Sequence, residues 1–237
     1  MSATLPAGEP AAGPWRRAPL TELLDLVLDR AGRPVGRPAI VAIDGRGASG
    51  KSTLAGRLHR RVPASAVIGT DDLAWHEPLF GWGRLLGAAL RPLREGRALD
   101  LRPPAWEAQG RAGALVVPAG FGLVLVEGTG ASWRERAGLV DATVWVQADF
   151  AEAERRGLAR DVASGVNGDA GAAAAFWHDW MAAELRFLER QRPWERACVV
   201  VNGTPTGPLA DDEVEVAPPP THARRDRRAA DRRTPGR

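Results

Sequence analysis

The chain has 237 residues and 44% apolar content, which suits one α/β domain of about 200 residues with a single substantial core. Its one cysteine excludes an intramolecular disulfide, and no stretch approaches the roughly 20 apolar residues of a membrane-spanning helix, so we expect a soluble, cytoplasmic protein. The net charge of +3 is uneven, because residues 222–237 carry +5 and residues 1–221 carry −2.

Both ends of the chain differ in composition from the part between them. Residues 1–14 are rich in alanine, proline and glycine, and we expect them to be flexible. Residues 217–237 combine prolines with arginines and have almost no apolar side chains, which predicts a disordered, Arg-rich tail. This tail could touch nucleic acid or an acidic surface nonspecifically, or could be a solvated terminus without a partner. A single folded domain is therefore predicted over residues 15–216.

A helix, a buried strand and a glycine-rich loop are predicted in the first part of this domain. Leucines and valines at helical spacing predict a helix over residues 20–28, with Gly32 as its stop. Ala39–Ile43 is apolar without polar alternation, which is typical of a buried parallel strand. Residues 45–52 then match the pattern G-x-x-x-x-G-K-[ST] and lead into a helix over 52–58.

The glycine-rich loop has the features of a phosphate-binding site. Free backbone N–H groups and the positive end of a helix dipole attract anions, so the loop predicts binding of a nucleoside triphosphate. An ordinary glycine-rich turn is the weaker alternative. The residues expected to contact the triphosphate are Gly45, Arg46, Gly47, Ala48, Ser49, Gly50, Lys51, Ser52 and Thr53.

Lys51 of this loop is the only lysine of the chain, whose other basic residues, apart from histidine, are 31 arginines. A compact ammonium on a flexible stem can lie between phosphate oxygens, where a planar guanidinium cannot. We therefore expect Lys51 to act on the phosphates during the reaction.

Two aspartates follow the second predicted strand, which spans residues 64–69. A phosphoryl acceptor needs a carboxylate within hydrogen-bond reach of its hydroxyl group. We favour Asp71 as this base, with Asp72 as a supporting group or a partner of metal-bound water. The alternative is a pair that caps a helix or forms an Asx turn. His76 is close enough along the chain to contact a substrate, or lies on the surface.

The next elements add a second candidate for metal binding. A helix is predicted over residues 85–93, followed by an irregular, proline-broken stretch over 97–114, in which Trp106 could stack on a base. The apolar strand 122–126 ends at Glu127, which could hold Mg²⁺ together with the hydroxyl group of Ser52, or could cap a turn.

The last part of the domain supplies arginines and completes the sheet. Arg156 and Arg160 share one face of a predicted helix and could neutralise charge on a transferring phosphoryl group, or form a salt-bridged helix surface. Apolar strands separated by helices indicate a mostly parallel, five-stranded sheet covered on both faces, and ligands bind at the carboxyl edge of such a sheet. The remaining elements are predicted as a strand over 142–146, helices over 150–163 and 173–190, and a strand over 198–201.

These motifs resemble, in their order, those of the uridine kinase-like P-loop kinases, a group that includes pantothenate kinase and phosphoribulokinase. The resemblance covers roughly residues 35–203 and is carried by Ala39–Thr53, Thr70-Asp71-Asp72, Val126-Glu127-Gly128 and Arg156–Asp161. It implies a three-layer P-loop kinase fold with a mobile lid, and ATP with Mg²⁺ as the phosphoryl donor. It also implies a base matching Asp71, a metal-associated glutamate matching Glu127, and lid arginines matching Arg156 and Arg160.

The sequence predicts a small-molecule kinase that acts on a hydroxyl group, with a nucleoside as the favoured acceptor. A nucleotide-dependent ATPase or switch without an acceptor is the alternative. A GTPase that reads guanine through Asn/Thr-Lys-x-Asp is excluded, because the single lysine is already used in the phosphate loop. A nucleic-acid-binding role through the tail ranks last, since the domain shows no basic aromatic platform. The oligomeric state stays open.

Overall fold

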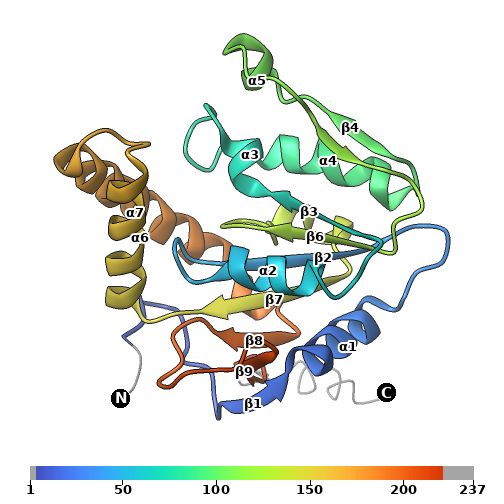
Figure 1. The fold of residues 1–237 in the computed structure, drawn as a ribbon, viewed down its shortest axis with the longest axis horizontal. Coiled ribbons are helices and arrows are strands. Elements are labelled where there is room, and N and C mark those ends of the chain that lie inside the picture. Colours follow the sequence, from blue (N-terminus) through green and yellow to red (C-terminus); the bar gives the residue numbers. More distant parts are fainter. Residues whose placement is uncertain (1–3, 221–237) are drawn as a thin grey trace, which may run out of the picture.

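A seven-stranded sheet lies at the centre of the structure, a computed structural model that describes residues 4–220 (Figure 1). Its strands are ordered β1-β9-β8-β7-β2-β6-β3. The five strands from β8 to β3 are parallel, whereas β9 pairs antiparallel with both β8 and β1. The strands span Arg16–Pro19 (β1), Ala39–Gly45 (β2), Ser65–Gly69 (β3), Leu123–Glu127 (β6), Ala142–Gln147 (β7), Val199–Asn202 (β8) and Glu213–Ala217 (β9).

The mostly parallel sheet is confirmed, but the count of five strands is wrong because β1 and β9 extend it to seven. β1 reads Arg-Arg-Ala-Pro and has no apolar run that would mark a strand. β9 alternates glutamate and valine, with Val214 and Val216 buried, as expected for a strand with one covered face. The predicted tail begins at residue 217, whereas in the structure Ala217 is the last residue of this strand.

The predicted helices are all present, with their ends shifted by a few residues. The stretch 97–114, predicted to be irregular, contains β4 (Leu99–Leu101), which pairs antiparallel with β5 (Leu115–Val117) just after it. The helices span Leu20–Ala31 (α1), Lys51–His59 (α2), Thr70–Ala74 (α3), Gly83–Arg94 (α4), Pro104–Ala108 (α5), Phe150–Ser164 (α6) and Ala170–Gln191 (α7), with 3-10 turns at Arg134–Leu139 (η1) and Pro193–Glu195 (η2).

Helices cover both faces of the sheet, which confirms the predicted three layers (Figure 1). Alternate residues of β2 divide between the faces. Val41 and Ile43 pack with α1 and α2, whereas Ile40 and Ala42 pack with α3 and α4. α7 contributes Phe187 to a third cluster over β7 and β8. Every residue of β2 is buried, so the loop that follows this strand starts from a fixed point.

The N-terminal segment is held against the sheet, although its composition predicts flexibility. The buried carboxylate of Glu9 accepts hydrogen bonds from Trp145 Nε1 at 2.8 Å and from Gln147 Nε2 at 2.9 Å. The backbone N–H of Ala12 donates to Gln147 Oε1 at 2.8 Å. Composition does not reveal this packing, because it depends on contacts of Glu9 and of the segment's backbone with side chains of β7.

Most of the predicted Arg-rich tail lies beyond the residues that the structure describes. Residues 1–3 and 221–237 lie outside the described part, so the Arg-rich tail and its contacts stay a prediction. Within residues 4–220, no helix has the length and apolar character needed to cross a membrane.

α6 and α7 pack so closely at Gly157 that a larger residue is expected to destabilise the fold. A Cβ at this position would lie 1.9 Å from Cη2 of the buried Trp177. We expect Gly157→Ala to lower the free energy of unfolding by about 1–3 kcal/mol in urea denaturation, because the helices must separate. Gly56→Ala is the matched control: it is also helical, its nearest neighbour lies at 3.6 Å, and no loss is expected. Equal losses would contradict this account.

Candidate functional site

The glycine-rich loop joins β2 to α2 at the carboxyl edge of the sheet (Figure 1). Gly50 has a φ of 96°, which favours glycine, and a Cβ on Gly45 would lie 2.7 Å from the carbonyl oxygen of Val146. Lys51 begins α2 and is buried, and its Nζ donates to the carbonyl oxygen of Arg46 at 2.6 Å. The ammonium group is therefore held against the loop.

Ser52 and Glu127 meet at this edge, as the convergence of parallel strands predicts. Ser52 Oγ donates to Glu127 Oε2 at 3.1 Å. Burial raises the pKa of Glu127, and the charges of Asp71 and Asp72 raise it further, while Lys51 and the Ser52 hydrogen bond oppose this. Within residues 4–220, no group of three or more His, Cys, Asp or Glu side chains could hold a metal ion alone. A hydroxyl group and one carboxylate fit Mg²⁺ that is otherwise held by phosphates and water.

Asp71 and Asp72 lie in the first turn of α3, and they differ in their contacts. The N-cap of α3 is Gly69, and no side chain caps the helix. Asp71 and Asp72 are therefore not a capping pair. Asp72 Oδ1 accepts from Arg111 Nη2 at 2.6 Å. Asp71 is exposed, and its carboxylate has no hydrogen bond or ion pair among the described residues. Of the two aspartates, Asp71 is therefore the one whose carboxylate is unpaired within residues 4–220.

Arg111 is a residue of this region that the sequence pattern did not single out. Its guanidinium lies 3.5 Å from the centroid of Trp106 and 5.2 Å from that of Trp75, in addition to its ion pair with Asp72. Trp106 is buried, and its Nε1 donates to the carbonyl oxygen of Asp72 at 2.9 Å. His76 packs edge-on against Trp75 at 4.3 Å. Among 31 arginines, nothing in the sequence marks Arg111.

The two predicted lid arginines lie on α6 and are engaged in contacts of their own. Arg156 donates to Glu152 Oε1 at 2.7 Å and to the carbonyl oxygen of Gly203 at 2.8 Å. Gly203 lies against the glycine-rich loop, because a Cβ there would be 2.1 Å from the carbonyl oxygen of Ser49. Arg160 is mostly exposed and is paired with Asp161. Arg156 is thus near the loop, whereas Arg160 is not brought to it by any contact of the described residues.

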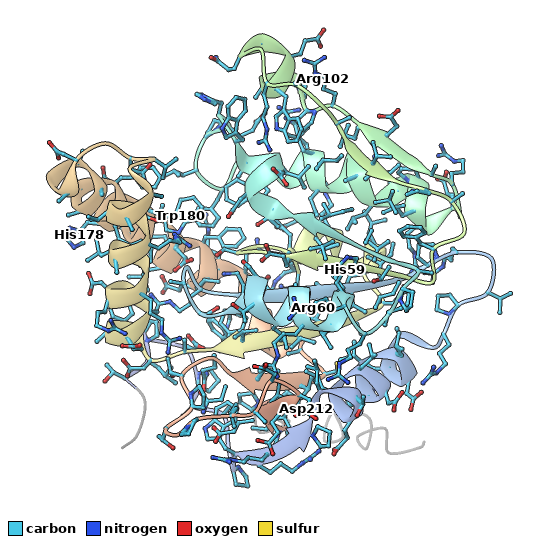
Figure 2. All side chains as sticks on the ribbon, in the orientation of Figure 1. His59, Arg60, Arg102, His178, Trp180 and Asp212 are labelled. Atoms are coloured by element: carbon cyan, nitrogen blue, oxygen red, sulfur yellow. The ribbon has the colours of Figure 1, made fainter. Side chains whose placement is uncertain are left out.

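α7 brings further residues to the loop that the sequence did not point to. The backbone N–H of Gly47 donates to Glu184 Oε1 at 2.8 Å, and a Cβ on Gly47 would lie 3.4 Å from Trp177 and 3.6 Å from Trp180. Figure 2 shows Trp180 on the inner side of the α6–α7 pair and His178 on its outer side. The tryptophan spacing predicts only a packed stripe, and Glu184 resembles any other glutamate on a helix.

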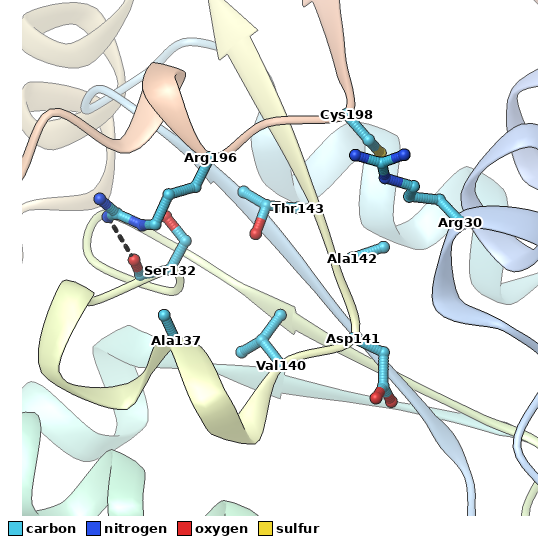
Figure 3. Close-up of a pocket in the computed structure, with 9 residues that line it drawn as sticks. All are labelled: Arg30, Ser132, Ala137, Val140, Asp141, Ala142, Thr143, Arg196 and Cys198. Atoms are coloured by element: carbon cyan, nitrogen blue, oxygen red, sulfur yellow. Dashed lines mark hydrogen bonds between the residues drawn. The ribbon is translucent and has the colours of Figure 1, made fainter. Parts of the chain in front are cut away.

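A separate cavity of ≈ 130 Å³ lies beside the starts of β7 and β8 (Figure 3). On one of its walls, Arg196 Nη2 donates to the carbonyl oxygen of Ser132 at 2.6 Å. Ligands of parallel sheets bind at the carboxyl ends of the strands, and none of the predicted site residues lines this cavity. It is therefore distinct from the candidate site. Its lining residues are Arg30, Ser132, Ala137, Val140, Asp141, Ala142, Thr143, Arg196 and Cys198.

Comparisons with known proteins agree with the architecture. The sequence matches no protein-family model and no curated protein. A solved structure named as a candidate fructose transport system kinase from Silicibacter sp. TM1040 is 22% identical, with a TM-score of 0.51 over 73% of this chain and 95% of that chain. D-glycerate 3-kinase from Cryptococcus neoformans var. grubii is 12% identical, with a TM-score of 0.50 over 79% of this chain and 97% of that chain. At these identities the likeness concerns the fold, and the predicted P-loop kinase fold is confirmed.

Proposed function

We propose that this protein is a kinase that transfers the γ-phosphoryl group of ATP, with Mg²⁺, to a hydroxyl group of a small molecule. The observation that carries the proposal is the meeting at one sheet edge of the lysine-bearing loop, the Ser52–Glu127 pair and the free carboxylate of Asp71. An ATPase switch would need the first two and could use the third to orient an attacking water molecule, so dependence of turnover on an acceptor decides between the two. The names of the two structural neighbours, both kinases, support a phosphotransferase.

The donor side of the proposed reaction uses the glycine-rich loop. Its backbone N–H groups and the Lys51 ammonium would hold the β- and γ-phosphates. Ser52 and Glu127 would hold Mg²⁺, which neutralises charge on the phosphate oxygens when it is bound. Ser52 Oγ and Glu127 Oε2 are 3.1 Å apart, so one ion could contact both oxygens.

The acceptor side uses Asp71. It would take the proton from the acceptor hydroxyl as that oxygen bonds to the γ-phosphorus, while the bond from phosphorus to the bridging oxygen of ADP breaks. Arg156 would neutralise charge on the equatorial oxygens, and Arg160 would join it if α6 moves as a lid.

A nucleoside is the first acceptor to test, and the residues beside Asp71 suggest how it would be bound. His76 and the Asp72–Arg111 pair offer polar groups to an acceptor. Arg111 covers one face of Trp106, so in this conformation Trp106 orients the arginine and does not offer that face to a base.

The raised pKa of Glu127 predicts that Mg²⁺-dependent ATP binding weakens on acidification. Only the ionised carboxylate ligates Mg²⁺, and burial moves its protonation to a pH above the ordinary value of 4.5. As the pH falls from neutrality toward this pKa, the Kd for ATP with Mg²⁺ should rise. The measurement is calorimetric titration with ATP of the wild type and of Glu127→Gln, with Mg²⁺ and with EDTA. Comparing the two proteins separates protonation of Glu127 from protonation of ATP itself. If the Kd for ATP with Mg²⁺ depends on pH in the same way in both proteins, Glu127 is not a ligand of the metal.

The proposed function is tested by phosphotransfer with purified protein. ATP and Mg²⁺ are supplied with nucleosides, pantothenate, sugar phosphates or glycerate, and the phosphorylated acceptor is detected by mass spectrometry. We expect ADP formation to depend on one of these acceptors. ATP hydrolysis at the same rate whatever acceptor is present would favour the switch, and no heat of ATP binding would refute both.

A further inference from the structure

Arg46, the second residue of the phosphate loop, points into the protein. Its side chain is 1% exposed, its guanidinium lies 4.2 Å from the centroid of the Phe150 ring, and its Nε lies 3.5 Å from Glu184 Oε2. None of its three side-chain nitrogens has a hydrogen bond among the described residues. Charge and an aromatic face therefore hold this arginine in place.

Glu184 of α7 is fully buried and joins three segments around the loop. Its Oε1 accepts hydrogen bonds from the backbone N–H of Gly47 at 2.8 Å and from Thr129 Oγ1 at 3.0 Å, while Oε2 faces Arg46. Thr129 follows β6, two residues after Glu127. One carboxylate thus contacts the loop backbone, the arginine of the loop, and the segment that carries the candidate metal ligand.

The buried charges of this cluster depend on one another, because an unpaired charge in the interior is costly. Burial lowers the pKa of Arg46, and the charges of Glu184 and Glu9 oppose this effect. Without the charge of Glu184, Arg46 would lose its nearest carboxylate and the loop would lose the group that balances its buried cation.

The cluster also links the loop to α6, which carries the predicted lid arginines, and to α7, which packs against α6. α6 and α7 pack through Gly157 and Trp177, and Trp177 lies against Gly47. Phe150, the ring beneath Arg46, is the first residue of α6. A displacement of α6 and α7 would therefore change the contacts of Arg46 and Gly47.

We propose that Glu184 is a positioning residue for the phosphate loop, acting through the N–H of Gly47 and the charge of Arg46. The inference rests on the proposed function, because it takes residues 45–52 to be the triphosphate site. It adds that phosphate affinity depends on α7 through a carboxylate that contacts the loop, without that carboxylate contacting the phosphates.

The test is Glu184→Gln, which keeps the shape and the Oε1 acceptor but removes the charge facing Arg46. We expect the Kd for ADP with Mg²⁺, measured by calorimetry, to rise about tenfold, and the KM for ATP to rise alike with little change in kcat or in the KM of the acceptor. Glu189→Gln, exposed on the same helix, is the matched control and should behave as the wild type. Adding Arg46→Met to Glu184→Gln removes both charges and should recover part of the affinity.

The outcomes separate this inference from the function on which it rests. Wild-type affinity in Glu184→Gln would overturn the inference and leave the proposed function standing, whereas a wild type that does not bind ADP would refute both. A purely structural role would lower the melting temperature without separating the KM for ATP from kcat. If Glu184→Gln does not fold, the double variant decides: weaker binding than the wild type supports the inference, and equal binding overturns it.

Discussion

Replacing Lys51 with alanine should lower kcat/KM for ATP by about 10²–10³-fold, the cost typical of losing one group that stabilises charge in a transition state. The ammonium is buried at the start of α2 and donates to the carbonyl oxygen of Arg46. Lys51 directly precedes Ser52, which is hydrogen-bonded to Glu127. Lys51→Arg should not restore the activity. A planar guanidinium does not replace a point charge between phosphate oxygens, and the space is tight, since a Cβ on Gly45 would lie 3.2 Å from Lys51 Cδ.

Initial rates of ADP formation and calorimetric titration with ATP measure this effect. Arg60→Ala is the control, because Arg60 is an exposed cation at the other end of the same helix (Figure 2) and should leave both quantities unchanged. Circular dichroism should show that Lys51→Ala keeps its fold. Full ATP affinity in Lys51→Ala would mean that the loop is not the phosphate site.

Much of the candidate site could be predicted because it depends on local patterns and on one rule of parallel sheets. Strand, loop and helix around residues 39–58 are contiguous in sequence. Ser52 and Glu127 are 75 positions apart, yet their contact was expected, because parallel strands all end at the same edge of the sheet. The three-layer architecture followed from apolar strands separated by helices.

The parts that were missed depend on long-range contacts that no pattern encodes. Glu184 acts on Gly47 across 137 positions, and Arg111 reaches Asp72 across 39. Arg111 is one of 31 arginines and has no sequence feature that distinguishes it. Glu184 is one glutamate of a long helix, and its role depends on where that helix packs. The contacts of the N-terminal segment are also long-range: its alanines and prolines set its composition, whereas Glu9 and the backbone of Ala12 bind it to β7.

Asp71→Asn should lower kcat by about 10²–10⁴-fold while leaving the Kd for ATP nearly unchanged, because a general base acts on the acceptor and not on the donor. Asparagine keeps the size of the side chain but cannot take the proton. Asp71 also raises the pKa of Glu127, so its loss should, if anything, favour the ionised glutamate and Mg²⁺ binding. Single-turnover phosphotransfer, with ATP affinity measured separately, distinguishes the two effects.

Asp72→Asn is the control that decides between the two aspartates. Its carboxylate is already paired with Arg111, and both partners are about one-third exposed, so loss of this ion pair should change kcat only a few-fold. A larger loss in Asp72→Asn than in Asp71→Asn would transfer the base to Asp72, with Arg111 leaving it when the acceptor binds. Full turnover in both variants would require a base outside α3, and the free carboxylate of Asp71 would then have no role in the reaction.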